Sequence, residues 1–202
     1  MQIKAVLFDI GDVLEICPPT GMDGRWETEL GMEPGSLWRD MGDVIHGGSI
    51  GTLTIEEQSA IFRERLGMND EQVLRFWEDI WEQYLGSPNE ELIEYFSNLR
   101  SRVRIGIISN SGVGCREKEQ GRYGFEDMCE IIVYSHEEGI LKPDRRIYDI
   151  ACERMNLRPE EAVFVDDLGE NIRVANELGF HGIVHVDNEQ TIAKIEELLK
   201  IP

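Results

Sequence analysis

Five short segments rich in Val and Ile constrain the fold of this chain more than any other feature of its sequence. They lie at residues 3–8, 103–108, 131–134, 162–165 and 182–186. Each is apolar almost throughout, which is typical of strands buried on both faces of a parallel sheet. Stretches with helical character follow the later segments, at residues 145–155, 170–178 and 189–199. Because strands alternate with helices, we predict an α/β fold built on a doubly wound parallel sheet.

Residues 15–102 interrupt this alternation. The interval contains no clear strand and several amphipathic helices, one of which starts at the capping box formed by Thr54 and Glu57. Another, at residues 69–85, carries Trp77 and Trp81 on an apolar stripe that we interpret as packing core. We therefore predict a core domain of residues 1–14 and 103–202. Residues 15–102 form an inserted helical cap domain, whose last helix, about 88–102, leads back into the core.

The charge of the chain limits its partners. Its 20 Lys and Arg residues stand against 40 Asp and Glu residues, giving a formal net charge of −20. Such a charge repels nucleic acid and anionic membranes, so we expect neither as a partner. No apolar run approaches the roughly 20 residues that cross a bilayer, and the short apolar N-terminus does not resemble a secretory signal. With four scattered cysteines read as reduced thiols, we expect a cytoplasmic protein, either a monomer or a homodimer.

Polar side chains stand where the predicted strands end. Ligands bind at the carboxyl ends of the strands in open α/β sheets, so these side chains are the first candidates for a functional site. They are Asp9 after the first strand, Ser109 and Asn110 after the second, Lys142 after the third, and Asp166 and Asp167 after the fourth. We expect three carboxylates, a hydroxyl and a lysine to converge at one edge of the sheet.

This combination of groups favours phosphate chemistry with a metal ion. Carboxylates packed together repel one another unless a cation bridges them, and Mg²⁺ prefers such oxygen ligands together with substrate phosphate. Ser109, Lys142 and the backbone N–H groups of the turns offer donors and positive charge to a phosphate group. A carboxylate that faces a phosphorus atom neutralised in this way can act as a nucleophile.

Four motifs, in order along the chain, resemble those of the haloacid dehalogenase superfamily. They are FDIGDVL at residues 8–14, IISNS at 107–111, LKP at 141–143 and FVDD at 164–167, the last followed by Asn171. The resemblance covers essentially the whole chain and implies a Rossmann-like core. The helical insertion occupies the position of the family's type C1 cap.

The resemblance also implies roles for individual residues. Asp9 would be the nucleophile and a Mg²⁺ ligand, and the backbone carbonyl of Gly11 would bind the same ion. Ser109 would bind phosphate through its hydroxyl, and Asn110 through its backbone N–H. Lys142 would stabilise the nucleophile and the phosphoryl group. Asp166 would bind Mg²⁺ directly, with Asp167 assisting through water. These roles describe a Mg²⁺-dependent phosphomonoesterase that acts on a small phosphorylated metabolite through an aspartyl-phosphate intermediate.

Gly11 departs from the pattern of this family's phosphatases, which usually place a second aspartate two residues after the nucleophile. That aspartate protonates the leaving group, a contribution of about 10²–10⁴ in rate. Asp12 would replace it only if the loop re-aims its side chain. Bacterial sugar-1-phosphatases of the family have a similar opening with glycine, and an anomeric phosphate depends less on a general acid. A sugar 1-phosphate is therefore our first expectation for the substrate.

Two alternatives to a phosphatase remain open. A metal-independent haloacid dehalogenase uses the same nucleophile on carbon, although it does not need the paired carboxylates of Asp166 and Asp167. A non-catalytic protein that binds a phosphorylated metabolite would keep the phosphate site without acid–base chemistry at Gly11.

Several other residues have two interpretations each. Asn171 either supports the active site or satisfies backbone groups at a helix start. In the predicted cap, Trp26, Trp38 and His46 are candidates to line a substrate pocket, whereas Trp77 and Trp81 fit packing core better.

Overall fold

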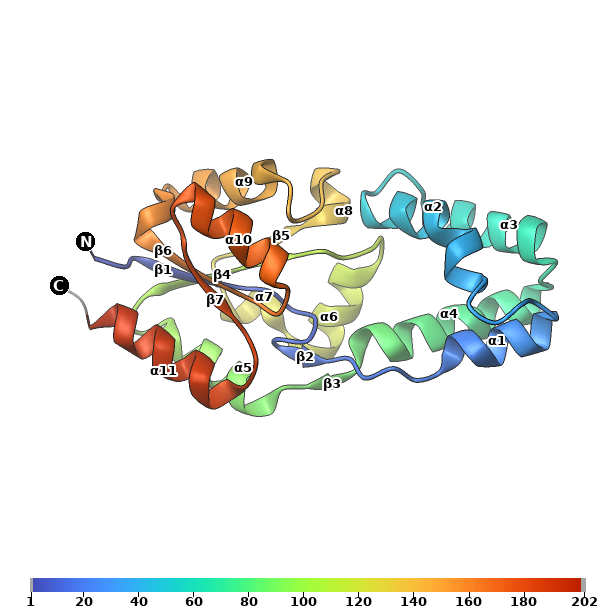
Figure 1. Ribbon diagram of the computed structural model, residues 1–202, viewed down its shortest axis with the longest axis horizontal. Helices are drawn as coiled ribbons and strands as arrows, with labels where there is room; N and C mark the ends of the chain where they lie inside the picture. Colours follow the sequence, from blue (N-terminus) through green and yellow to red (C-terminus); the bar gives the residue numbers. More distant parts are fainter. Residues whose placement is uncertain (1, 201–202) are drawn as a thin grey trace.

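The computed structural model describes residues 2–200 and is centred on a five-stranded parallel sheet (Figure 1). Its strands are β1 (Ala5–Phe8), β4 (Arg104–Ser109), β5 (Ile131–Tyr134), β6 (Ala162–Asp166) and β7 (His181–Val184). Their order across the sheet is β5-β4-β1-β6-β7, and every neighbouring pair is parallel. The predicted Rossmann-like α/β sheet is confirmed. The strand boundaries differ slightly from those predicted, since β1 starts at Ala5 rather than at residue 3.

Helices cover both faces of this sheet. Helices α5 (Glu90–Leu99) and α11 (Asn188–Leu199) pack on one face, and α9 (Arg145–Met155) and α10 (Gly169–Leu178) pack on the other. The alternation along β1 shows why its sequence is apolar throughout. Val6 and Phe8 belong to the first apolar cluster, and Ala5 and Leu7 belong to the second.

Shorter elements complete the core. They are α6 (Cys115–Tyr123), α7 (Phe125–Met128), α8 (Ser135–Glu138) and the 3₁₀ turn Pro159–Glu161. Helix α8 begins directly after β5, at the edge of the sheet where the strands end. It faces the helices of the insertion (Figure 1).

The insertion forms a four-helix unit beyond the carboxyl edge of the sheet (Figure 1). Its helices are α1 (Met22–Leu30), α2 (Leu37–Ser49), α3 (Ile55–Leu66) and α4 (Asp70–Leu85). The unit has an apolar cluster of its own, in which Trp26 and Phe62 pack edge-on against Phe76 at ring centroid distances of 5.2 and 5.0 Å. The predicted capping box of Thr54 and Glu57 is confirmed at the start of α3.

Two short strands that the sequence did not predict join the four-helix unit to the core. β2 (Glu15–Ile16) pairs with β3 (Ser87–Pro88) in an antiparallel ribbon where the chain leaves and re-enters the core. The prediction that residues 15–102 hold no strand was wrong, because strands of two residues are too short to show an alternating pattern. A Cβ atom on Gly86, whose φ is +51°, would lie 2.1 Å from the carbonyl oxygen of Ile16, so this junction requires glycine.

Helix α5 follows this ribbon and belongs to the sheet rather than to the four-helix unit. Its buried Leu92, Phe96 and Leu99 lie in one apolar cluster with the strands, and the ring of Phe96 meets that of Phe8 at 5.2 Å. The division into residues 1–14 and 103–202 against residues 15–102 stays a prediction.

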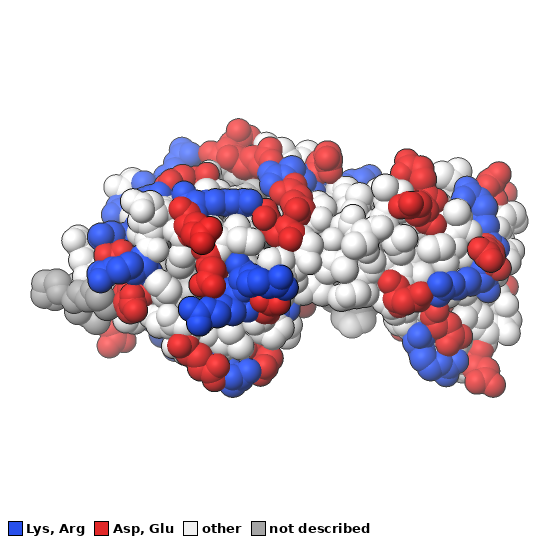
Figure 2. Space-filling model, turned by 90° about the horizontal axis from the view of Figure 1, so that it is seen from above, with Lys and Arg blue, Asp and Glu red and all other residues white. Residues whose placement is uncertain are grey.

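Charged side chains of both signs are intermixed over the core and over the four-helix unit on the face shown in Figure 2. The band between the two units shows few of them on that face. None of the described helices combines the length and the apolar character that crossing a membrane requires.

Candidate active site

Asp9 stands at the centre of the carboxyl edge of the sheet. Phe8, the last residue of β1, lies opposite Ile107 of β4 and Val165 of β6. The next residue on each strand therefore brings Asp9 beside Asp166. The strand order reverses at β1, and ligands of doubly wound sheets bind in the crevice at such a point.

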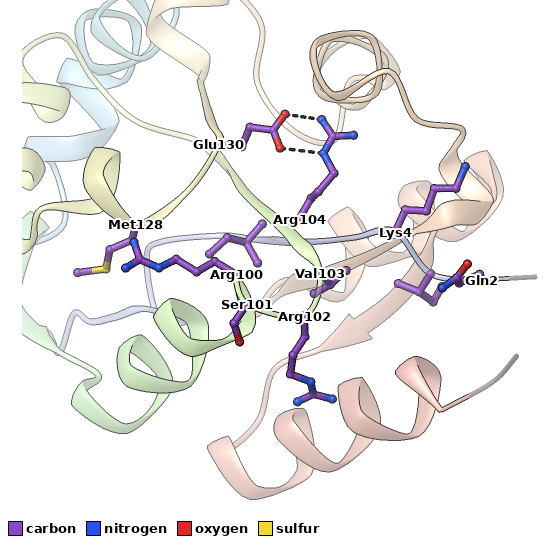
Figure 3. A pocket seen from close by; sticks show the side chains of 11 residues that line it. Gln2, Lys4, Arg100, Ser101, Arg102, Val103, Arg104, Met128 and Glu130 are labelled. Atoms are coloured by element: carbon purple, nitrogen blue, oxygen red, sulfur yellow. Dashed lines mark hydrogen bonds and ion pairs between the residues drawn. The ribbon is translucent and has the colours of Figure 1, made fainter.

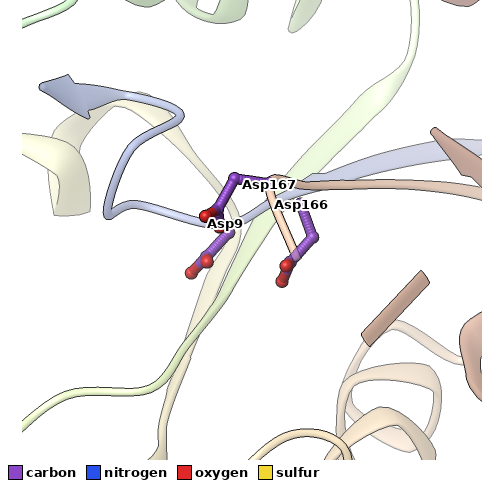
Figure 4. A group of neighbouring side chains, drawn as sticks. All are labelled: Asp9, Asp166 and Asp167. Atoms are coloured by element: carbon purple, nitrogen blue, oxygen red, sulfur yellow. The ribbon is translucent and has the colours of Figure 1, made fainter. Parts of the chain in front are cut away.

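Three carboxylates gather where β1 and β6 end (Figure 4). One oxygen from each of Asp9, Asp166 and Asp167 lies within 4.8 Å of the others. Asp166 is fully buried, Asp9 is 8% exposed and Asp167 is half-buried. The structure thus brings together the three acidic residues that the sequence placed at this edge.

Lys142 is buried between two of these carboxylates. Its Nζ atom lies 2.6 Å from Oδ1 of Asp9 and 2.8 Å from Oδ2 of Asp166, and it donates to the carbonyl oxygen of Ile108 at 2.9 Å. An ammonium group has three N–H donors, so all of them are used. The lysine side chain therefore has one fixed position, against the proposed nucleophile.

Asn110 fixes the backbone of Lys142. Its Oδ1 accepts the N–H of Lys142 at 2.7 Å, and its Nδ2 donates to the carbonyl oxygen of the same residue at 3.0 Å. The sequence implied a role only for the backbone N–H of Asn110. A contact between side chain and backbone across 32 positions leaves no pattern in the sequence that would have revealed it.

The electrostatics of the cluster suit a divalent cation. Burial is the largest cause that raises the pKa of Asp9 to about 7; the Lys142 ammonium opposes it, and the charge of Asp166 adds to it. Burial and the charge of Asp166 also raise the pKa of Asp167. Three carboxylates share one ammonium group, so the cluster has two negative charges in excess when all three are ionised. Oxygen ligands with this excess fit Mg²⁺.

Asp166 is held in place by two donors. Its Oδ1 accepts the backbone N–H of Leu168 and the Nδ2 group of Asn171, both at 2.9 Å. Asn171 is buried inside α10, two residues after the start of the helix. Of its two interpretations, the structure supports the one in which Asn171 orients an acidic residue of the site.

Ser109, Gly11 and Asp12 occupy the rim of the cluster in different ways. The Ser109 hydroxyl is buried, and its contact with the carbonyl oxygen of Asn110 is long at 3.5 Å, so this hydroxyl is poorly engaged. Gly11 follows β1 and carries no side chain to reach a ligand. Asp12 has a left-handed backbone (φ +51°), is exposed, and accepts the N–H of Cys17 through Oδ1 at 3.0 Å.

A cavity of about 190 Å³ lies between the four-helix unit and the core, beside Asn110. Trp77, Ile80 and Trp81 of α4 line it from the four-helix unit, and Val113 of the loop after β4 lines it from the core. The interpretation of Trp77 as packing core is confirmed, because it packs against the apolar cluster of the unit and its ring lies 5.6 Å from that of Phe62. Trp77 and Trp81 also line the cavity, which the helical stripe did not predict, because a stripe shows which side is apolar but not whether it meets protein or a cavity.

The other three candidates of the four-helix unit do not line this cavity. Trp26 is buried in the apolar cluster of the unit and donates through Nε1 to Oδ2 of Asp79 at 2.6 Å. Trp38 is 37% exposed and stacks on Phe76, and His46 is exposed.

A larger cavity, about 570 Å³, lies at the opposite edge of the sheet, near the starts of β1 and β4 (Figure 3). Its arginines are already paired or bonded: Arg104 with Glu130, and Arg102 with Glu196 at 2.6 Å. The edge is the amino end of the strands, away from Asp9. We therefore place the candidate active site at the smaller cavity and the acidic cluster.

Comparison with known proteins agrees with this fold. The family model described as haloacid dehalogenase-like hydrolase matches residues 3–179. A glyceraldehyde 3-phosphate phosphatase of Methanopyrus kandleri is 30% identical over 197 residues, covering 88% of this chain and 82% of that protein. The acyl-CoA dehydrogenase family member 10 of Mus musculus is 29% identical over 98% of this chain, which spans only 19% of that protein.

A solved structure is similar as well. It is a haloacid dehalogenase family enzyme of Bacteroides thetaiotaomicron in complex with magnesium and inorganic phosphate. The TM-score is 0.81 at 21% identity, and the match covers 94% of this chain and 98% of that one. At this identity the likeness establishes the fold.

Proposed function

Because this chain belongs to the haloacid dehalogenase-like hydrolase family, we propose that it is a Mg²⁺-dependent phosphatase of a small phosphorylated compound. One observation carries the proposal. Asp9, Asp166 and Asp167 meet at the switch point of the sheet, with Lys142 bonded to the first two. The relative named as a glyceraldehyde 3-phosphate phosphatase supports this class of substrate.

The residues present fit a magnesium ion. Asp9, Asp166, Asp167 and the carbonyl of Gly11 would hold it, and the ion would supply positive charge to the phosphate oxygens. The magnesium and phosphate bound to the similar enzyme of Bacteroides thetaiotaomicron support this choice of ion. Ser109, the N–H of Asn110, Gly11 and Lys142 would contact the phosphate group.

Asp9 is the group that reacts. Its carboxylate attacks phosphorus, the bond from phosphorus to the leaving oxygen breaks, and the leaving oxygen takes the electron pair. Water then attacks phosphorus and releases inorganic phosphate, which restores the carboxylate. Lys142 keeps the carboxylate of Asp9 in position, since its ammonium group lies 2.6 Å from Oδ1 of that residue.

The leaving oxygen has no obvious proton donor among the described residues of the site. Gly11 has no side chain, and the carboxylate of Asp12 is bonded to the N–H of Cys17. Substrates whose leaving group departs without a general acid are therefore favoured. A sugar 1-phosphate, the substrate class first expected from the sequence, meets this requirement.

The two alternatives make opposite predictions in one experiment. Purified protein is assayed for phosphate release from p-nitrophenyl phosphate, acetyl phosphate, glucose 1-phosphate and glyceraldehyde 3-phosphate, with Mg²⁺ and with EDTA. Halide release from 2-haloacids is measured in parallel. A phosphatase releases phosphate only with Mg²⁺. A dehalogenase releases halide in EDTA, and a binding protein releases nothing while it still binds Mg²⁺.

Two variants identify the nucleophile. Asp9→Asn should abolish phosphate release while the far-ultraviolet circular dichroism stays unchanged. Asp23→Asn, which alters an exposed aspartate of α1, is the matched control and should keep the wild-type rate. Phosphatase activity retained by Asp9→Asn would overturn the mechanism.

We also propose that the protein acts in the cytoplasm, as a monomer or a homodimer. All four cysteines are free thiols in the structure, which suits a reducing compartment. Size-exclusion chromatography with light scattering decides between the two oligomeric states.

A further inference from the structure

The cavity beside Asn110 has a mostly apolar lining, which is unusual for an enzyme that acts on phosphorylated metabolites. Trp77, Ile80, Trp81 and Val113 line it, and Ile45 of α2 adds a further apolar side chain. None of the residues that line it is Lys, Arg, Asp or Glu. A charged leaving group would therefore find no side chain of opposite charge in the lining of this cavity.

The polar side chains around the cavity are already bonded within the protein. Ser111 Oγ lies 2.7 Å from Nδ1 of His136, and Trp77 Nε1 donates to Ser59 Oγ at 2.8 Å. The Tyr84 hydroxyl donates to Glu119 at 2.7 Å, and both atoms of the Asn110 amide bind the backbone of Lys142. Among the described residues that line the cavity, this leaves Trp81 Nε1 and Gln58 Oε1 as side-chain groups without a hydrogen-bond partner.

A sugar fits such a wall poorly. Each hydroxyl that leaves water without finding a new partner costs binding energy. A sugar carries several hydroxyls, and the side chains of the cavity leave little more than one donor and one acceptor free. An apolar group has no such cost and gains from leaving water.

The size and lining of the cavity suit one aromatic ring. An apolar protein cavity of about 150 Å³ binds benzene, and the volume here is about 190 Å³. The rings of Trp77 and Trp81 lie 5.7 Å apart and nearly parallel, at 22°. Aromatic rings favour edge-to-face and offset contacts with one another, which this wall provides to a planar guest.

The cavity joins the reacting groups through Asn110. This residue lies in the cavity wall and holds the backbone of Lys142, whose ammonium group contacts Asp9. From this shared residue we infer that the leaving group of a phosphate bound at Asp9 lies on the side of the cavity.

We propose that the substrate is a phosphate monoester of a small phenol, whose ring occupies the cavity lined by Trp81 and Val113. The proposal rests on the phosphatase function proposed above. When Asp9 attacks, the bond between phosphorus and the aryl oxygen breaks, and its electron pair stays on that oxygen. The leaving group departs as an aryloxide, which then takes a proton from water. An aryloxide is a stable anion, so the lack of a side-chain acid at Gly11 costs little.

Binding and reactivity are measured separately to test this. In Mg²⁺, we compare inhibition of acetyl phosphate hydrolysis by benzylphosphonate and by methylphosphonate, neither of which reacts. Benzylphosphonate should bind at least about tenfold more tightly, the effect of one ring leaving water. The kcat/KM for phenyl phosphate should also exceed that for glucose 1-phosphate by about 100-fold or more.

Variants locate the ring. Trp81→Leu should remove most of the preference for benzylphosphonate over methylphosphonate. Trp38→Leu is the matched control, because Trp38 lies on the outer part of the four-helix unit and does not line the cavity; it should keep the preference. If Trp81→Leu binds benzylphosphonate as the wild type does, the ring does not occupy this cavity and the proposal is overturned.

The outcomes separate this inference from the proposed function. No release of phosphate from acetyl phosphate in Mg²⁺ would defeat the phosphatase itself. Release from acetyl phosphate and glucose 1-phosphate, with equal binding of the two phosphonates, would leave the phosphatase standing and overturn the aromatic substrate. The comparison of phosphonates uses the wild-type protein, so it does not depend on any variant folding.

Discussion

Nζ of Lys142 lies 2.6 Å from Oδ1 of Asp9 and 2.8 Å from Oδ2 of Asp166, and the three side chains are buried. One cation therefore compensates two carboxylates that have little contact with water. A buried charge that loses its partner is far more costly than an exposed one. The lysine thus contributes to folding as well as to the proposed reaction.

Lys142→Met should destabilise the protein by about 3–5 kcal/mol, because it leaves both carboxylates without a counter-charge. Urea unfolding in EDTA at pH 7.5 measures the change. Lys194→Met, which removes an exposed lysine of α11, should stay within about 0.5 kcal/mol of the wild type. Equal stability of the two variants would contradict the compensation inferred here.

Asn171→Ala should weaken Mg²⁺ binding by about 10–100-fold, the usual cost of losing a partner that orients a metal ligand. The amide of Asn171 donates to Oδ1 of Asp166, and only the N–H of Leu168 would still hold that oxygen. A Mg²⁺ titration followed by thermal unfolding gives the affinity. Asn176→Ala on the same helix removes a bond to the N–H of Gly182 instead, and it should leave the affinity unchanged.

Gly11→Asp should speed hydrolysis of phosphates with poor leaving groups. A Cβ atom on Gly11 would meet nothing within 4 Å, and its φ lies outside the left-handed region, so the site has room for the side chain. A well-placed general acid contributes about 10²–10⁴ in rate. The ratio of kcat for glucose 6-phosphate to kcat for acetyl phosphate should rise. A ratio that stays constant or falls would show that the new carboxylate does not reach the leaving oxygen.

The sequence was sufficient to predict the sheet and the acidic cluster. Buried parallel strands are apolar throughout, so the polar residues that follow them, such as Asp9 and Asp166, mark the strand ends directly. The ribbon of β2 and β3 was not predicted, because a strand of two residues is too short to show an alternating pattern of apolar and polar side chains. Trp77 and Trp81 were placed on the correct side of their helix, but periodicity does not distinguish a packed neighbour from a cavity.

Glu119 illustrates a feature that the sequence hides. It lies in α6, whose other residues are mostly charged or polar, and nothing around it suggests burial. The structure shows it fully buried, with bonds from the hydroxyls of Tyr84 and Tyr134. The first tyrosine belongs to α4 and the second to β5, so partners brought together only by the fold make this position tolerable.

Glu119 should make stability depend on pH. Burial, opposed by bonds from the two tyrosines and by Arg116, raises its pKa from 4.5 to about 7. The folded protein therefore holds a proton that the unfolded chain releases between these values. The stabilising contribution of the protonated form is complete below about pH 4.5 and is lost as pH rises to about 7, in total about 3 kcal/mol.

Glu119→Gln removes this titration. Relative to the wild type, the variant should gain about 3 kcal/mol in unfolding free energy between pH 4.5 and pH 7.5. Urea unfolding at several pH values measures the difference. Glu117→Gln alters an exposed residue of the same helix. Its unfolding free energy should depend on pH as that of the wild type does. If the unfolding free energy of Glu119→Gln shows the same pH dependence as that of the wild type, then Glu119 does not hold a proton in the folded protein.

Gly51 sets how closely the four-helix unit approaches the core. Its φ is +69°, and a Cβ atom there would lie 2.0 Å from the carbonyl oxygen of His136 in α8. Beside it, the carbonyl oxygen of Ser49 accepts the hydroxyl of Ser135 at 2.8 Å. The end of α2 therefore rests on the core through backbone atoms, next to the cavity.

Gly51→Ala should hold the four-helix unit away from the core, because backbone at this contact has no room to yield. A displacement of about 1 Å at an active site costs up to about 100-fold in rate, so kcat/KM for phenyl phosphate should fall by about 10–100-fold.

Gly67→Ala separates strain from displacement. Gly67 has a nearly identical φ of +68°, and a Cβ atom there would meet nothing within 4 Å. The left-handed backbone at alanine should lower the stability of that variant by about 1–2 kcal/mol, and its kcat/KM should match that of the wild type. If the two variants show the same kcat/KM, the approach of Gly51 to His136 does not determine how the site is assembled.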